Sequence, residues 1–149
     1  MRQFAQIMIV TAAVACLPSM VQAKVRITVD LDRQTMHVES KNRTYDWKVS
    51  SGKSGYETPP GSYGVLWTDK DHPSDEYNKT PMPNAIFFKP GFAIHGASKS
   101  AWGHPASHGC VRLPVAKSAI LFDLVKAEGA DIKIVGDGPA TLEAREPTP

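Results

Sequence analysis

Apolar and polar residues alternate along the N-terminal part of the chain, which indicates antiparallel strands. Residues 25–31 and 35–39 carry apolar or β-branched side chains at every second position, the pattern of a strand with one buried face. A turn at Asp32–Arg33 separates them, and a second turn at Asn42–Arg43 precedes a third such segment, residues 44–50. We therefore expect a meander of three antiparallel strands.

Glycine and proline interrupt the middle of the chain, where the pattern is weaker. Residues 63–67 are expected to form a short strand, whereas residues 68–84 show no apolar period and predict a long surface loop. Two apolar runs, 85–88 and 92–95, flank Pro90–Gly91 and predict a β-hairpin.

One helix is predicted near the C-terminal end. Apolar residues recur at helical spacing after Pro114, and Gly129 supplies a stop signal. Residues 131–135 then alternate as a final strand. Many strands and one principal helix predict a mainly β fold with a mixed-sheet core, in which the helix directly follows the segment around Cys110.

The first 23 residues have the features of a cleaved secretory signal. Arg2 provides a basic start, an apolar run extends from Ile7 to Leu17, and Val21 and Ala23 are small residues before the expected cleavage site. The run is shorter than the roughly 20 apolar residues that span a bilayer, so no transmembrane segment is expected in the mature chain. A lipoprotein acylated at Cys16 is the alternative.

The rest of the chain predicts a single domain, residues 24–136, followed by a polar, proline-rich and flexible tail, residues 137–149. Seventeen basic side chains against fifteen acidic ones give a net charge of +2, with no clustered basic face. This distribution argues against nucleic-acid binding.

Cysteine usage makes Cys110 the candidate for chemistry. Once a signal containing Cys16 is removed, Cys110 is the only thiol and has no intramolecular disulfide partner. An exported protein with one leftover cysteine is expected to use it in an intermolecular disulfide or as a reactive thiol. A buried, inert cysteine remains the alternative.

The neighbours of Cys110 favour a reactive thiol. His95, His108 and Arg112 lie within the same segment, and the predicted helix follows. Only a thiolate attacks well, and an imidazole, a cation or a helix N-terminus lowers a thiol pKa. Gly109 permits a sharp turn, and the amides of Gly109 and Cys110 are candidate donors to a developing oxyanion.

Other histidines and aromatic residues have simpler interpretations. A zinc site built from the histidines around Cys110 is an alternative without recognisable metal-site spacing. His104 is expected to pack in a surface loop, and His37 and His72 to be solvated, whereas Trp47 and Trp67 are expected in the core. Trp102 can equally line a pocket or pack.

Two blocks of sequence resemble a known family. Ile94-His95-Gly96, a spacer containing Gly103, and the block Ser-His-Gly-Cys-Val-Arg-Leu at 107–113 closely resemble the signature of the YkuD-type L,D-transpeptidases. Ser51-Gly52 and the run 58–61 look like the family's upstream loop. The resemblance spans about residues 25–135 and implies a YkuD-like β-sandwich; Arg112 stands where some members have Asn, and the spacer is short.

The resemblance implies a role for each matching residue. Cys110 corresponds to the nucleophile, His95 to the histidine that activates the thiol, and His108 to a supporting histidine. Gly96 corresponds to the residue whose backbone carbonyl orients the imidazole. The positions expected near the substrate or its oxyanion are Ser107, Gly109 and Arg112.

The implied reaction is acyl transfer in the periplasm during peptidoglycan synthesis, without a metal or cofactor. Cys110 would attack the diaminopimelate–D-Ala bond of a tetrapeptide stem, and an amine of another stem or an outer-membrane protein would accept the acyl group. Water as acceptor would make the enzyme an L,D-carboxypeptidase or an amidase. A papain-like peptidase is disfavoured because no histidine follows Cys110, and a non-catalytic cell-wall-binding protein is the alternative from another class.

Overall fold

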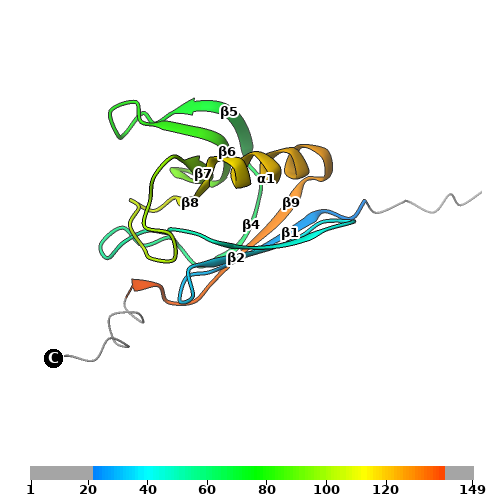
Figure 1. Cartoon of the computed structure of the whole chain (residues 1–149), viewed down its shortest axis with the longest axis horizontal. Coiled ribbons are helices and arrows are strands. Elements are labelled where there is room, and N and C mark those ends of the chain that lie inside the picture. Colours follow the sequence, from blue (N-terminus) through cyan, green and yellow to red (C-terminus); the bar gives the residue numbers. More distant parts are fainter. Residues whose placement is uncertain (1–21, 140–149) are drawn as a thin grey trace, which may run out of the picture.

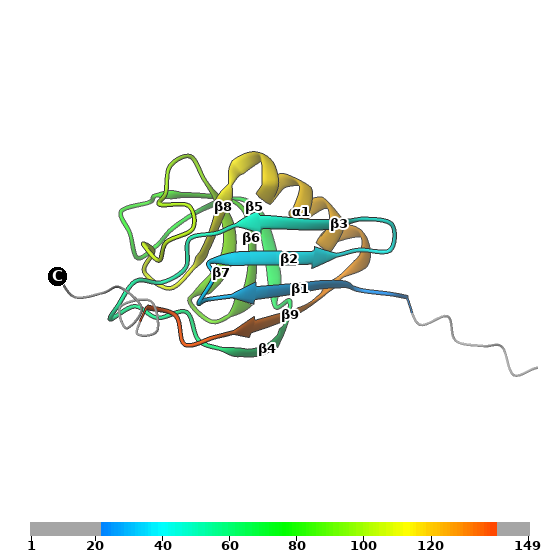
Figure 2. The same ribbon diagram turned by 60° about the horizontal axis from the view of Figure 1, so that its bottom comes forward.

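Two β-sheets and one helix share the main hydrophobic core in the computed structural model, which describes residues 22–139 (Figure 1). The first sheet has five strands, seen face-on in Figure 2, in the order β3 (Thr44–Lys48), β2 (Thr35–Glu39), β1 (Val25–Asp30), β9 (Ala130–Val135) and β4 (Gly61–Gly64). The second has four strands in the order β5 (Trp67–Pro73), β6 (Pro81–Lys89), β7 (Phe92–Ala97) and β8 (Val111–Pro114). The predicted class, mainly β with mixed sheets and one helix, is confirmed.

The pairing of the strands confirms two sequence predictions. Strands β1, β2 and β3 form the expected antiparallel meander, and β6 and β7 form the hairpin that turns at Pro90–Gly91. Each sheet also has one parallel pair, because β9 joins β1 and β8 joins β7. The second of these pairs sets His95 of β7 opposite Arg112 of β8.

Helix α1 (Val115–Glu128) packs one face onto the core. Its buried residues follow helical spacing: Ser118, Leu121, Phe122 and Val125. Gly129 ends the helix with φ 71°, and its amide donates to the Val125 carbonyl at 2.8 Å. The predicted helix after Pro114 is confirmed. Residues 111–114, which alternate buried and half-buried positions, form the strand β8, which the sequence did not predict.

The segment after Gly61 differs most from its sequence prediction. Residues 63–67 do not form one strand: Tyr63 belongs to β4 in the first sheet and Trp67 begins β5 in the second. The predicted long loop at 68–84 is mostly strand, and only residues 74–80 connect β5 to β6. Because β5 lies at the sheet edge and is largely exposed, its polar residues carry no alternating signal.

The core contains side chains from both sheets and from α1. Its largest fully buried members include Ile27, Met36, Ile86, Leu113 and Leu121. Each such side chain contributes about 1.5–3 kcal/mol relative to an exposed one. Trp47 is buried as predicted, but Trp67 is 46% exposed, so its assignment to the core is wrong.

The structure describes only part of the predicted N-terminal signal and of the predicted C-terminal tail. The expected signal, residues 1–23, lies outside the described residues except for its last two positions, as do residues 140–149 of the expected tail. At the start of that tail, the amides of Asp137 and Gly138 donate to the Asp32 carboxylate at 3.0 and 3.1 Å. Within residues 22–139, no helix has the length and apolar character needed to cross a bilayer.

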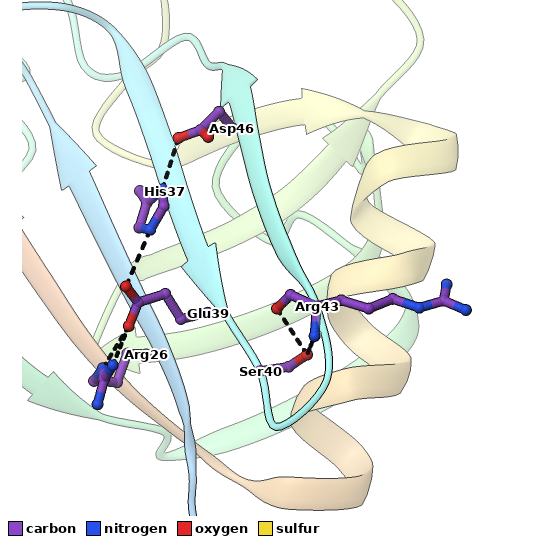
Figure 3. Close-up of polar contacts among 6 residues, drawn as sticks. All are labelled: Arg26, His37, Glu39, Ser40, Arg43 and Asp46. Carbon is purple, nitrogen blue, oxygen red and sulfur yellow. Dashed lines mark hydrogen bonds and ion pairs between the residues drawn. The ribbon is translucent and has the colours of Figure 1, made fainter.

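A charged ladder crosses the outer face of the first sheet (Figure 3). His37 of β2 bonds the Asp46 carboxylate of β3 through Nδ1 at 2.6 Å and the Glu39 carboxylate through Nε2 at 3.2 Å. Glu39 in turn accepts from Arg26 Nε of β1 at 2.8 Å. The hydrogen bonds to Asp46 and Glu39 raise the pKa of His37 above its usual value of 6.5. The His37 side chain is 42% exposed, in agreement with the expected solvation, but it belongs to a charged network that the sequence did not predict.

We expect His37 to make the stability of the fold depend on pH. Because its folded-state pKa is raised, its stabilisation is fully present below about pH 6.5 and is lost as the pH rises through the folded-state value. His37→Gln should therefore lower the free energy of unfolding by about 0.5 kcal/mol at low pH, the scale of an exposed ion pair, and by less at about pH 8.5. Urea unfolding across this range measures the difference.

The matched control is His104→Gln, since His104 is exposed and belongs to none of the ion pairs formed among residues 22–139. An equal effect of His37→Gln at both pH extremes would show that the ladder does not titrate as described.

Candidate active site

A cavity of about 170 Å³ brings four of the predicted site residues together. His95, His108, Cys110 and Arg112 all line it. The parallel pairing of β7 and β8 explains this, because it sets His95 beside Arg112, and Cys110 immediately precedes β8. The remaining lining residues, which the sequence did not single out, are Ser74, Tyr77, Thr80, Met82 and Gly91.

His95 is buried and held in one tautomer. Its Nδ1 lies 2.8 Å from the Gly96 carbonyl oxygen, and because a carbonyl can only accept, Nδ1 carries the proton. The unprotonated nitrogen is therefore Nε2. Burial, with a smaller contribution from the positive charge of Arg112, lowers the pKa of His95 to about 4, although the bond to Gly96 opposes the shift. His95 is thus neutral at physiological pH.

The side chain of Cys110 is likewise uncharged, as a protonated thiol. Burial raises its pKa, the nearby Glu76 charge adds to the rise, and a backbone hydrogen bond from Ala93 and the charge of Arg112 oppose it. The expectation of a lowered thiol pKa is therefore wrong. Two of the three anticipated causes are missing, since His95 is uncharged and β8 separates Cys110 from the start of α1.

The turn that carries Cys110 is tied by the Ser107 hydroxyl. Ser107 Oγ donates to the Cys110 carbonyl at 2.5 Å and accepts from the Gly109 amide at 3.1 Å. The Gly109 amide, expected to be an oxyanion donor, is therefore already occupied. Ser107 is fully buried and shapes the turn without lining the cavity.

Position 109 requires glycine for two reasons, its backbone conformation and the lack of space for a side chain. Its φ is +117°, a region that side chains rarely adopt, and a Cβ here would lie 2.7 Å from the ring of Phe92. The sequence predicted that a substrate would lie close to Gly109, but the group that approaches it is the Phe92 side chain of β7.

Thr58 fastens the same turn from the upstream loop. Its hydroxyl donates to the Gly109 carbonyl at 2.7 Å and accepts from the Gly52 amide at 2.9 Å. Thr58 is 1% exposed, so loss of this hydroxyl would leave two buried backbone groups unpaired. The sequence indicated Thr58 only through the resemblance of its loop.

His108 lies between two tyrosines. The Tyr77 ring stacks on it at 4.6 Å with planes 12° apart, and the Tyr56 ring meets it edge-on at 4.6 Å. The three residues come from three different loops, so no periodic pattern could have associated them. His104 is exposed and does not line the cavity, in agreement with its expected place in a surface loop, and neither does Trp102.

A second cavity of about 300 Å³ also reaches Cys110. It shares Cys110 and four other lining residues with the first cavity, namely Ser74, Tyr77, Met82 and Gly91. It adds Glu76, His72 and the aromatic pair Trp67–Phe87, whose rings stack at 3.8 Å. His72 is half-buried and bonds Asp69 at 3.1 Å, so its expected full solvation is wrong. The two cavities therefore adjoin at Cys110 and differ in the residues that each adds.

The described residues give the alternative of a zinc site no support. Within residues 22–139, no group of three or more His, Cys, Asp or Glu side chains is arranged to hold a metal ion.

The family model of the L,D-transpeptidase catalytic domain, YkuD, matches residues 24–138. The chain belongs to this family. The match contains both sequence blocks and every residue that lines the two cavities.

Solved structures of L,D-transpeptidases have the same fold. The enzyme from Stackebrandtia nassauensis is 27% identical with a TM-score of 0.70, and the match covers 80% of this chain and 59% of that one. The enzyme from Xylanimonas cellulosilytica is 26% identical with a TM-score of 0.64, covering 78% and 62%. A third, in complex with imipenem, is 20% identical with a TM-score of 0.65, covering 74% and 58%.

The chain thus matches about three fifths of the length of these solved L,D-transpeptidases. No curated protein matches it in sequence.

We expect the reactivity of the Cys110 thiol to depend on the two charges beside it, those of Arg112 and Glu76. Because burial raises the pKa of Cys110, its alkylation rate should still increase with pH above the range of an ordinary thiol. Arg112→Gln removes a charge that favours the thiolate and should raise the apparent pKa. Glu76→Gln removes a charge that disfavours it and should lower the apparent pKa.

Iodoacetamide alkylation rates against pH measure both shifts. Lys126→Gln, in the last turn of α1 and exposed, is the control that should leave the profile unchanged. Shifts of the same sign for Arg112→Gln and Glu76→Gln would contradict the electrostatic description.

Proposed function

We propose that Cys110 is the acyl-accepting nucleophile of a peptidoglycan L,D-transpeptidase, with His95 as its general base and acid. The observation that supports this most is the hydrogen bond from His95 Nδ1 to the Gly96 carbonyl, which leaves Nε2 as the proton acceptor in the cavity that contains the thiol. An imidazole whose pKa is about 4 is neutral at working pH and can accept a proton at the moment of attack.

The first step would start from the uncharged pair. His95 Nε2 takes the thiol proton while the Cys110 sulfur attacks the carbonyl carbon of the diaminopimelate–D-Ala bond. The tetrahedral intermediate then collapses to a thioester, and the D-Ala amine leaves with the proton from His95. A buried imidazolium with a lowered pKa gives up its proton readily. Burial therefore hinders ionisation of the Cys110 thiol but assists protonation of the departing D-Ala amine.

The second step would reverse the proton movements. The acceptor, after its ammonium form has lost one proton to solvent, attacks the thioester as a neutral amine. His95 Nε2 takes a proton from the attacking nitrogen, and the sulfur leaves with that proton to restore the thiol. Positioned acid–base catalysis of this kind contributes about 10² to 10⁴ in rate.

Arg112 suits the donor substrate. It lines the first cavity, and none of the ion pairs formed among residues 22–139 includes it. A tetrapeptide stem has carboxylates near the bond to be broken, and a guanidinium binds a carboxylate through two parallel hydrogen bonds. We therefore assign the first cavity to the donor stem.

The second cavity supports transfer to an amine over hydrolysis. Its Glu76 belongs to no ion pair among residues 22–139, whereas Asp75 is bound to Lys79 at 2.5 Å. The exposed face of Trp67 adds an aromatic surface, and both features attract an ammonium group. The acceptor can be an amine of a second stem or a lysine of an outer-membrane protein, since both present the same group.

The proposal includes an extracytoplasmic location. Peptidoglycan lies outside the cytoplasmic membrane, so a catalytic domain at residues 24–136 would need export, for which residues 1–23 are the proposed signal.

Acylation by a carbapenem tests the nucleophile and separates the two histidines. Imipenem should add one covalent adduct to the protein, and Cys110→Ser should abolish it, because a hydroxyl is a far weaker nucleophile at neutral pH. His95→Ala should slow acylation by about 10² to 10⁴, and His108→Ala by much less. Intact-protein mass spectrometry over time measures all three.

An adduct that forms equally fast on Cys110→Ser would refute the assignment of the nucleophile. A wild-type protein that forms no adduct with imipenem or a tetrapeptide stem would favour a non-catalytic wall-binding protein. A larger loss for His108→Ala than for His95→Ala would exchange the two roles.

If the second cavity binds the amine acceptor, changes in its lining should alter how much of the thioester is transferred to the amine and how much is hydrolysed. Trp67→Ala and Glu76→Gln should lower the ratio of transferred to hydrolysed product by about tenfold, because the ammonium is held less well than before. Chromatography of products from a tetrapeptide stem, with and without an added amine acceptor, gives this ratio. If the ratio does not change in either variant, the second cavity does not bind the acceptor.

A further inference from the structure

Strand β6 is distorted at Asn84, at the point where a regular strand would place a backbone amide against the Gly96 carbonyl. We call this distortion the kink. The ladder between β6 and β7 ends at the pair Ile86↔Ile94, although both strands continue beyond it. Continued in the same register, it would place Asn84 opposite Gly96. Asn84 instead has φ +57°, in the left-handed region, within a strand.

The direction of the backbone groups shows what the kink prevents. The Phe87 carbonyl accepts from the Leu66 amide, so Phe87 directs its backbone groups toward β5. Along a strand, the backbone N–H and C=O groups of one residue point to one neighbouring strand and those of the next residue point to the other. Ile86 therefore directs its backbone groups toward β7. In a regular strand, Asn84, two residues away, would do the same. An undistorted β6 would then offer the Asn84 amide to the Gly96 carbonyl, which is the acceptor that His95 uses.

The side chain of Asn84 is anchored so that the kink persists. Asn84 is 6% exposed, and its Nδ2 donates to Ser118 Oγ of α1 at 3.0 Å. Ser118 Oγ in turn donates to the Val115 carbonyl at 2.8 Å, so the chain of donors and acceptors is complete.

Gly96 closes the same cluster from β7. A Cβ on Gly96 would lie 2.5 Å from Ser118 Oγ and 3.1 Å from the ring of Pro83. The first turn of α1, the kinked part of β6 and the Gly96 backbone are therefore in direct contact.

We propose that Asn84 is a positioning residue for His95: its left-handed conformation, anchored by Ser118, interrupts the β6–β7 ladder and leaves the Gly96 carbonyl to the His95 imidazole. The inference rests on the proposed role of His95 as base. Asn84 touches neither cavity, so it acts only through Gly96 and the tautomer of His95.

Asparagine suits this position for two reasons. It adopts the left-handed region more readily than most residues, and its amide supplies the donor to Ser118. Glycine would keep the first property and lose the second, whereas alanine would lose both. The pair Asn84→Gly and Asn84→Ala therefore separates the effect of the kink from a general loss of packing.

The test observes the His95 tautomer in the unliganded protein by long-range ¹H–¹⁵N NMR. Wild type and Asn84→Gly should show a single tautomer protonated at Nδ1, and Asn84→Ala should show a mixture with the Nε2-protonated form. Acylation by imipenem should be within about threefold of wild type for Asn84→Gly and about 10- to 100-fold slower for Asn84→Ala.

Asn84→Ser provides a second route if Asn84→Ala does not fold, because serine disfavours the left-handed region but still carries a polar group that can face Ser118. It should also yield mixed tautomers, whereas Ser118→Ala, which like Asn84→Gly loses only the bond to the Asn84 amide, should keep the single Nδ1 tautomer. A folded Asn84→Ala or Asn84→Ser that keeps the single Nδ1 tautomer would overturn the proposal, as would an Asn84→Gly that is as impaired as Asn84→Ala. The NMR reading needs no substrate, so it stays decisive even if Cys110 is not the nucleophile.

Discussion

The arrangement of the site depends on one hydrogen bond, from the His95 imidazole to the backbone carbonyl of Gly96. The bond fixes the tautomer without a charged partner. Burial lowers the pKa of the imidazole to about 4, although the bond itself opposes the shift, so the imidazole stays neutral. A carboxylate in the same place would have favoured the imidazolium and a preformed thiolate. The neutral backbone acceptor instead favours an uncharged pair that separates charge only when the substrate is attacked.

The rest of the fold maintains this pair by backbone pairing and a few buried hydroxyls. The parallel ladder of β7 and β8 brings His95 and the Cys110 turn together, and Ser107 and Thr58 hold that turn in shape. Asn84 and Ser118 make a similar contact on the other side of β7. Ser107 closes its own turn, whereas Thr58 and Ser118 join segments distant in sequence, so the geometry of the site depends both on the local turn and on the surrounding core.

Short-range patterns in the sequence sufficed for most of the framework. Alternation predicted the meander and the β6–β7 hairpin, helical spacing predicted α1, and the motif around Cys110 identified four residues of the cavity. The edge strand β5 was missed because its polar, exposed residues do not alternate. The stacking of Tyr77 on His108 and the bond that anchors Asn84 to Ser118 exist only through tertiary contacts. The thiol pKa was misjudged for the same reason, since its burial cannot be read from neighbouring residues.

The most direct measurement of the central claim is intact-protein mass spectrometry during turnover of a purified tetrapeptide muropeptide. A cysteine acyl-transferase predicts release of free D-Ala, a transient adduct on Cys110 with the mass of the stem lacking its terminal D-Ala, and a cross-linked product that forms as the adduct disappears. Release of D-Ala by Cys110→Ser at the wild-type rate, or a wild-type protein that neither forms the adduct nor releases D-Ala, would contradict it.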